Sequence, residues 1–135
     1  MRLNIECIRD VLLTSEEKTN LNNEVINIDV LVTMPRLKNY NEEDIIYTIK
    51  KLKEANYIEA DILIHSDGNR AMIRHLTYEG HLFLDNIRDD GIWKKAKKEA
   101  SKISSSVSIN ILSNIAIKLS SLYWFLLFSE KSNLR

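Results

Sequence analysis

The chain has very few of the residues that constrain a backbone. Among 135 residues there are one cysteine, one proline and three glycines. A single cysteine, Cys7, excludes an internal disulfide framework and is typical of a reducing compartment. Apolar free cysteines are usually buried, so we expect Cys7 to be a structural thiol in a packed core.

Neither sign of charge is in excess. The sequence has 19 Lys and Arg against 19 Asp and Glu, a formal net charge of +0. Because nucleic-acid binders usually carry a basic excess, any basic surface here must be local. Hydrophobic residues make up 44% of the chain, enough for the core of one domain. No signal-peptide pattern is visible, and we expect a cytoplasmic protein.

The motifs of common catalytic sites are also missing. There is no Gly-rich phosphate loop, no G-x-S-x-G and no H-E-x-x-H. His75, Glu79 and His81 could be considered as metal ligands, but their spacing fits no closed zinc motif. We therefore expect no enzyme activity, no catalytic residue, no metal and no cofactor.

Capping residues predict two helices in the first part of the chain. Asn4 is a good N-cap for a helix running to about Glu17. Asn41 is the N-cap of a second helix, with Asp44 as its capping-box partner, and Asn56 can take the left-handed conformation that ends it.

Alternation of apolar and polar residues predicts three strands. Residues 26–32 alternate before Pro35, which ends the first strand. Residues 58–64 and 70–76 form the arms of a hairpin, and Asp67-Gly68 is a strong signal for its turn.

A third helix follows the hairpin and begins after Thr77, whose hydroxyl can cap it. Gly80 costs helix stability and usually marks the close approach of another backbone. Gly91 stands where a left-handed C-cap belongs. The inner face of this helix is formed by Leu76, Gly80, Phe83 and Ile87.

The run from Arg74 to Trp93 reads RHLTYEGHLFLDNIRDDGIW. It resembles an uncharacterised family from prokaryotes and phages with the signature R-L-T-W-E-G-H-x-F-L-D-x-I-R-D-D-x-x-W. Its L-T-x-x-G portion, leaving a strand, also resembles the exit from the wing of many winged-helix proteins. The resemblance covers most of the first 90 residues and the helix after them, and it supplies no function.

Helix, strand, helix, hairpin and helix is the order of a winged helix-turn-helix domain. We predict an α+β fold with a winged-helix-like domain at residues 1–90 and a three-stranded antiparallel sheet. A separate second helix is missing from the pattern, unless residues 34–40 supply it. Residues 91–135 are predicted to form a two-helix extension.

Two functions remain open at this stage. One is a DNA-associated regulator of the phage or prophage type, binding double-stranded DNA. Its contacts would come from the second major helix and the hairpin, through Tyr47, Lys50, Lys51, Asn69 and Arg70. The other is a protein-interaction module without nucleic-acid binding, which the acidic helix start at residues 42–44 favours. The fold alone decides neither.

The extension carries lysines on its first helix and an apolar seam on its last. Ser106 is expected to cap the last helix, at residues 107–128. Its seam has heptad-like spacing, so we expect this helix to pack on the helix at residues 92–103 and on its counterpart in a second chain. The homodimer would form through Ile109, Leu112, Ala116, Leu119, Tyr123 and Leu126. Lys118 and a polar stripe argue against a membrane span.

Overall fold

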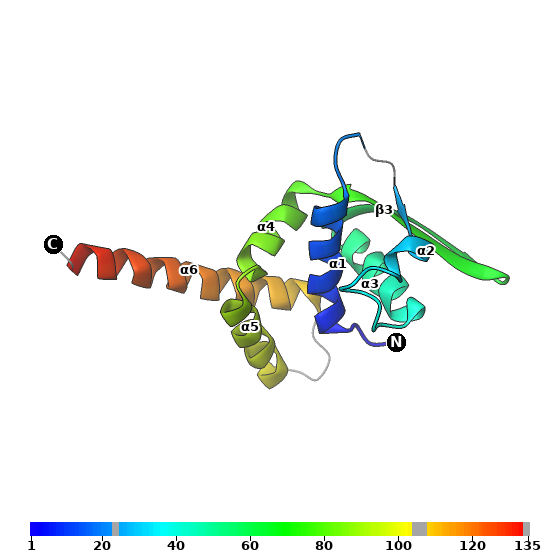
Figure 1. Cartoon of the computed structure of the whole chain (residues 1–135). Helices are drawn as coiled ribbons and strands as arrows, with labels where there is room; N and C mark the ends of the chain where they lie inside the picture. Colours follow the sequence, from blue (N-terminus) through cyan, green and yellow to red (C-terminus); the bar gives the residue numbers. More distant parts are fainter. Residues whose placement is uncertain (23–24, 104–107, 134–135) are drawn as a thin grey trace. The chain divides into compact units, whose positions relative to one another are not determined.

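The computed structural model describes residues 1–22, 25–103 and 108–133, with side chains as far as Ser129 (Figure 1). Within these ranges it contains six helices and one three-stranded antiparallel sheet. The chain divides into two compact units, Met1–Leu84 and Asp85–Arg135. The division falls inside α4 (Tyr78–Ile87), whereas the sequence prediction placed it at residue 90.

Both predicted N-caps are confirmed in the first unit. Helix α1 (Ile5–Lys18) begins where the Asn4 side chain accepts a hydrogen bond from the Cys7 backbone N–H. Helix α3 (Glu42–Glu54) begins where Asn41 Oδ1 accepts one from the Asp44 N–H at 2.7 Å. Each side chain satisfies a backbone donor that has no partner within its helix.

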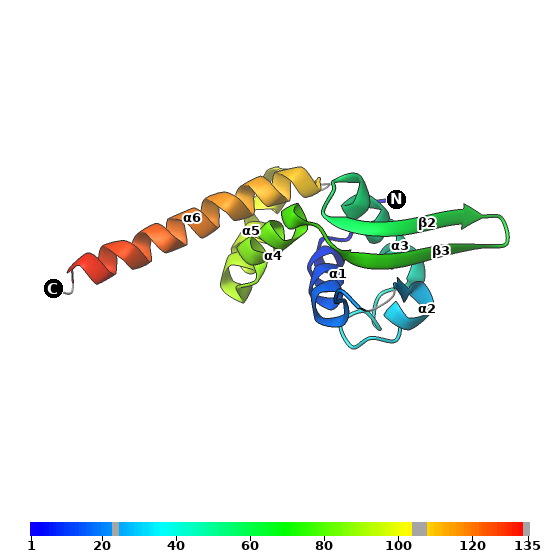
Figure 2. The same ribbon diagram turned by 90° about the horizontal axis from the view of Figure 1, so that it is seen from above.

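The sheet has the strand order β1-β3-β2. Strand β1 (Ile26–Asn27) and strand β2 (Ile58–His65) each pair antiparallel with β3 (Gly68–Leu76). Helices α1 and α3 contact the sheet, and the hairpin of β2 and β3 projects beyond them (Figure 2). The register shifts between Glu59 and Ala60, which produces a bulge on β3.

The strand predicted at residues 26–32 is wrong beyond Asn27. The chain turns instead into α2 (Ile28–Leu31), closed by the Val32 N–H donating to Ile28 O at 3.0 Å. A strand would have buried Val30, but Val30 is 49% exposed and Leu31 is fully buried. The three-residue spacing of Ile28 and Leu31 lets one face of a helix bury both side chains, which alternation along a strand would not do. A short second helix therefore exists, ahead of the residues predicted for it.

The predicted hairpin forms, but its turn lies one residue earlier than predicted. His65 pairs with Gly68, so the two-residue connection is Ser66-Asp67 rather than Asp67-Gly68. Gly68 has φ +142°, which an L side chain rarely adopts. The glycine is still required by the turn, as the first residue of β3 instead of a loop residue.

The core of the first unit lies between the sheet and its helices. Fully buried side chains come from α1, α3 and both long strands: Ile8, Leu12, Ile45, Ile49, Leu52, Ile58 and Ile73. Cys7 is buried as predicted, and burial raises the pKa of its thiol to about 11. The Tyr40 hydroxyl donates to Asp10 Oδ2 at 2.7 Å. Burial is the main cause that raises the pKa of Tyr40, and this hydrogen bond is the second.

A backbone clasp joins the end of α3 to the start of α4. The Thr77 N–H donates to Tyr57 O at 3.1 Å, and the Thr77 hydroxyl donates to Asn56 O at 2.7 Å. Thr77 Oγ1 also accepts from the Gly80 N–H, which confirms the predicted cap. A Cβ at Gly80 would lie 1.9 Å from Tyr57 O, so the predicted close approach is confirmed as well.

The left-handed residue that ends α3 is Asn56, with φ 65°, as predicted. Gly91 does not have the predicted C-cap role. Within the described ranges, positive φ occurs at Asn56 and Gly68, while Gly91 lies in the first turn of α5 (Asp90–Ile103). Asp89 Oδ1 accepts from the Ile92 N–H at 2.9 Å and starts the new helix immediately after α4. The chain therefore needs no left-handed residue here.

The second unit consists of the end of α4, α5 and α6 (Ile109–Asn133), and α5 contacts α6. Ile92, Trp93, Ala96 and Ala100 are buried, as the predicted stripe requires, whereas Ile103 is 62% exposed. Ser106 lies outside the described residues. The cap that the structure describes is Ser108, whose hydroxyl accepts from the Ile111 N–H at 3.2 Å.

Candidate nucleic-acid interface

Helix α3 has one buried face and one outward face. Its core residues recur at three- and four-residue steps, so the residues between them point away from the core. We call these residues the α3 outward face: Glu43, Tyr47, Lys50, Lys51 and Glu54. Two of the five are lysines and two are glutamates, so the face carries no formal net charge.

The structure brings Tyr47 and Lys51 together. The Lys51 ammonium lies 5.4 Å from the centre of the Tyr47 ring and 2.9 Å from Glu54 Oε2. The hydrogen bond with Glu54 raises the pKa of Lys51 and lowers the pKa of Glu54. A phosphate would have to displace Glu54 to reach Lys51. Lys50 is the lysine of this face without such a bond in the part of the chain described.

The residues before α1 also reach this face, which sequence reasoning missed. The Tyr47 hydroxyl donates to Met1 O at 3.5 Å, and Arg2 beside Met1 is exposed. No local signal connects Met1 with Tyr47, because the contact joins residues far apart in the sequence. The start of the chain therefore approaches the α3 outward face at Tyr47.

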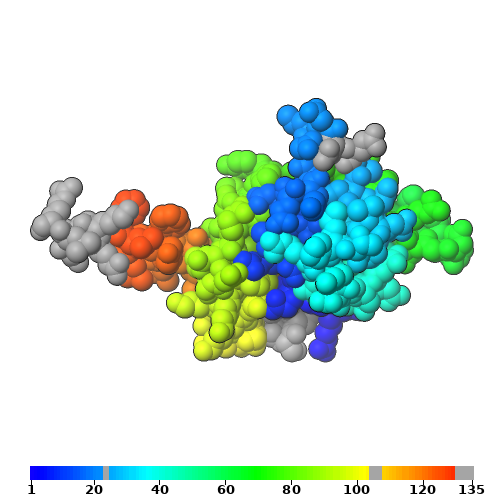
Figure 3. Space-filling model, in the orientation of Figure 1, coloured from blue at the N-terminus to red at the C-terminus, as the bar shows by residue number. Residues whose placement is uncertain are grey.

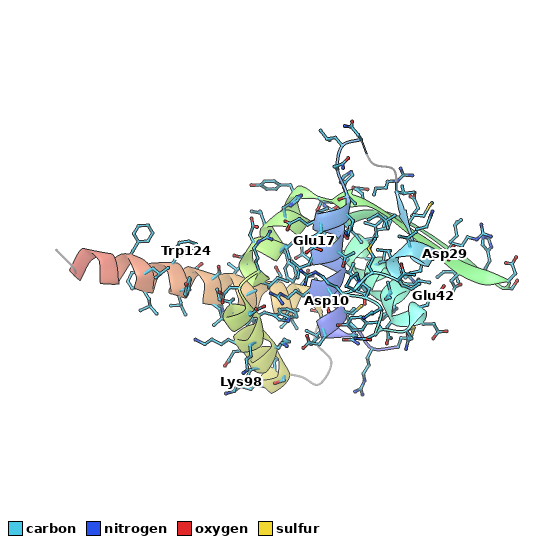
Figure 4. All side chains as sticks on the ribbon, viewed as in Figure 1. Asp10, Glu17, Asp29, Glu42, Lys98 and Trp124 are labelled. Atoms are coloured by element: carbon cyan, nitrogen blue, oxygen red, sulfur yellow. The ribbon has the colours of Figure 1, made fainter. Side chains whose placement is uncertain are left out.

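The acidic start of α3 opposes a nucleic-acid role. Glu42 and Glu43 are exposed, and Figure 4 shows Glu42 at the beginning of the helix. Negative side chains in a first turn complement the positive end of the helix dipole. They also repel phosphate at the helix end that usually leads into a major groove.

The two predicted hairpin residues are exposed but lie on opposite faces of the hairpin. Asn69 pairs with Ile64 and Arg70 with Leu63, and successive strand residues point to opposite faces. Asn69 is on the same face as the buried residues Ala71 and Ile73. Arg70 is on the other face. The five predicted DNA contacts are therefore not gathered into one patch.

Beside Arg70 the outer face of the sheet is hollowed into a groove of about 560 Å³. Among the residues that line it are Asn27, Asp29, Asp61, Arg70 and Met72. Asp61 accepts from Arg74 Nη2 at 2.6 Å. Acidic groups and an internal ion pair make this groove a poor phosphate site.

The hairpin also exposes large apolar side chains. Leu63 is 51% exposed and Ile64 is 62% exposed, although the predicted alternation placed Ile64 on a buried face. The prediction fails at Ile64 because the helices leave the end of the hairpin near the turn uncovered (Figure 2). The distal part of the hairpin has no protein layer over it within the described unit.

The residues predicted for dimerisation divide into two groups. Ile109, Leu112 and Ala116 are buried inside the chain's own second unit, with exposures of 6%, 1% and 0%. Leu119 is half-buried, while Tyr123 and Leu126 are exposed. Only the second group is free for another molecule, and dimerisation stays a prediction.

The candidate metal ligands do not form a site in the described ranges. No group of three or more His, Cys, Asp or Glu side chains there could hold a metal ion. His75 Nδ1 lies 2.9 Å from Leu76 O, and His81 is exposed.

Comparison with known proteins identifies the family. A family model described as "Hypothetical protein (DUF2513)" matches residues 2–107. The chain belongs to the DUF2513 family. An uncharacterized protein of Haemophilus influenzae is 26% identical over 116 residues, which cover 86% of this chain and 92% of that protein. No solved structure matches. The DUF2513 match ends before α6.

Proposed function

We propose that the first unit of this DUF2513 protein is a winged-helix domain that binds double-stranded DNA as a regulator. Support comes from the order of α1, β1, α2, α3, β2 and β3 and from a hairpin that projects past its helices. In such a domain α3 is the helix that enters a groove, and the hairpin is the wing.

The proposal rests mainly on the residues in the middle of the α3 outward face. Tyr47, Lys50 and Lys51 are adjacent there, and Tyr47 is bonded to Met1, which precedes Arg2 in the sequence. Lysine ammonium groups are ordinary donors to phosphate, whereas the Tyr47 hydroxyl already donates to Met1 O. The acidic residues at both ends of the face limit the interaction to a few phosphates, so we expect weak and strongly salt-dependent binding.

Fluorescence anisotropy with a random-sequence duplex at two salt concentrations tests this function. Lys50→Gln should weaken binding to every sequence and lower the salt slope by about 0.9, the value for one phosphate contact. Arg70→Gln tests the hairpin in the same way. Lys94→Gln, an exposed lysine on α5, is the matched control and should change nothing. If the unmodified protein fails to bind even at low salt, DNA binding is ruled out.

A second function, protein interaction, has its own support in Leu63 and Ile64. Exposed apolar side chains on a projecting hairpin are more typical of a protein interface than of a DNA contact. In that case Ile64→Ser should abolish capture of a purified partner without changing thermal stability. The same variant should leave DNA binding intact if the wing acts only on phosphate.

A further inference from the structure

Helix α6 changes character along its length. Its first half is amphipathic, with a buried face at Ile109, Leu112, Ala116 and Ser120 and exposed Asn110, Asn114 and Lys118 opposite. From Leu122 onward the pattern disappears. We call residues 122–128 the apolar tip. Its exposed members are Leu122, Tyr123, Trp124, Phe125, Leu126 and Phe128.

The apolar tip is exposed on all sides. Successive helix residues are rotated by about 100°, so seven consecutive residues surround the axis. The exposed fraction of these six residues ranges from 44% at Tyr123 to 70% at Phe128, and Leu127 between them is half-buried. Figure 3 shows this end of α6 standing clear of α5, and Figure 4 shows the Trp124 side chain pointing away from its helix. The surface has no polar side that would face water.

We propose that the apolar tip inserts into the surface of a lipid bilayer and holds this DUF2513 protein at a membrane. The inference is independent of DNA binding. Lipid covers a helix on every side, whereas one partner helix covers a single stripe. Tyr123 and Trp124 add the amphipathic rings that are enriched where a membrane meets water.

A second copy of the chain fits this surface less well. Two crossed tips would bury about three large side chains each, roughly 450–750 Å² per chain at about 150–250 Å² for each aromatic residue. Stable interfaces bury about 800 Å² per partner. The upstream seam cannot enlarge the contact, because Ile109, Leu112 and Ala116 are already buried inside the unit.

The charges of α5 and α6 suit an anionic membrane. Exposed lysines at positions 94, 95, 98, 102 and 118 outnumber Asp90 and Glu99, the acidic residues of these helices through Ser129. Lysines near an anionic surface strengthen binding, but they act within about 10 Å and are screened by salt. Insertion of the apolar tip does not depend on charge and is not screened by salt. Resistance to salt therefore distinguishes insertion of the tip from electrostatic adsorption to the surface.

The tip enters one leaflet rather than crossing the bilayer. Residues 109–129 are long and apolar enough to cross by length and composition. The first half of that stretch is packed against α5, however, and Lys118 lies near its middle. Seven residues rise about 10 Å along the helix axis, against about 30 Å for the hydrocarbon core.

Vesicle flotation of the full chain tests the proposal, with vesicles of phosphatidylcholine and phosphatidylglycerol and no detergent. We expect the protein to float and to stay bound after a high-salt wash. Phe125→Ser combined with Leu126→Ser should weaken binding by at least about a hundredfold, since each buried side chain contributes about tenfold or more. Ile117→Ser is the matched control, because Ile117 is a 46% exposed apolar residue upstream of the tip.

Tryptophan emission gives a second readout. Lipid should shift the emission of the unmodified protein to shorter wavelength, because Trp124 is 59% exposed while Trp93 is 4% exposed. Trp124→Phe should keep flotation and lose the shift. Release by salt, or failure to float, would overturn the proposal. Dimerisation in buffer without vesicle binding would also overturn it and would make a second copy the occupant of the tip.

Discussion

Helices α3 and α6 use similar residues in different arrangements. In α3 the apolar residues recur at three- and four-residue steps, and Ile45, Ile49 and Leu52 are all fully buried. In α6 the same spacing holds only as far as Ser120, and the apolar residues after it surround the axis and are exposed. Periodicity therefore marks where a helix has a protein partner, and its loss marks a change of environment.

The largest expected effect is the difference between substitutions at two leucines of α6. Leu112 is 1% exposed and Leu126 is 61% exposed. Leu112→Ala should lower the free energy of unfolding of the second unit by about 2–5 kcal/mol, because it leaves a cavity. Urea denaturation followed by fluorescence of the buried Trp93 measures this change.

Leu126→Ala is the control and should change that free energy by less than about 0.5 kcal/mol. If both variants lost the same stability, the two halves of α6 would share one environment in solution. The division of the helix at Leu122 would then be wrong.

A second comparison concerns two glycines in helices. A Cβ at Gly80 would lie 1.9 Å from the Tyr57 carbonyl oxygen, while one at Gly91 would meet Asp89 Oδ1 at 3.1 Å. Gly80→Ala should cost about 3 kcal/mol, at the upper end of overpacking, because a backbone must move. Gly91→Ala needs only a small side-chain shift and gains helix propensity, so thermal denaturation should find it near neutral.

The buried thiol of α1 predicts a dependence on pH. The folded pKa of Cys7, about 11, lies above the ordinary thiol value of 9.0, chiefly because of burial. Its contribution is fully present below pH 9 and is lost as the pH rises towards 11, by about 2 kcal/mol. Cys7→Ala should lack this part of the alkaline decline, measured by urea denaturation across that range. Parallel declines would show that the thiol is not buried in solution.

The smallest expected effect separates two threonine hydroxyls. Thr77 donates to Asn56 O and accepts from the Gly80 N–H, whereas Thr33 donates to Val30 O on the surface. Thr77→Val should lower the free energy of unfolding by about 1 kcal/mol, the usual contribution of an N-cap side chain. Thr33→Val should have no measurable effect. Equal effects would mean that the clasp depends on packing and not on the hydroxyl.

Elements with local causes could be predicted from the sequence. Asn4, Asn41 and Thr77 cap helices through bonds to residues three positions later, and Asn56 ends α3 by its own conformation. Gly80 was predicted correctly because a glycine inside a helix needs a neighbour to explain it. Each of these signals involves residues that are close together in the sequence.

Features that depend on tertiary packing could not be predicted. The alternation before Pro35 fits a strand, and only the core position of Leu31 selects the helix α2. The contact between Tyr47 and Met1 has no sequence signal, so the approach of the chain's first residue to α3 was missed. The seam of α6 predicted its contact with α5, which the structure confirms, but it did not reveal that full burial stops at Ser120.

The clasp fixes the base of a hairpin whose far end is free of the core. Tyr57 and Thr77 are tied to each other by the backbone, and Tyr57 stacks on Phe83 with ring centroids 5.0 Å apart. Ile58 and Ile73 of the two arms are buried, whereas Leu63 and Ile64 near the turn are exposed. The turn at Ser66-Asp67 is therefore the place on the first unit where a fluorophore could be attached at a distance from the buried side chains.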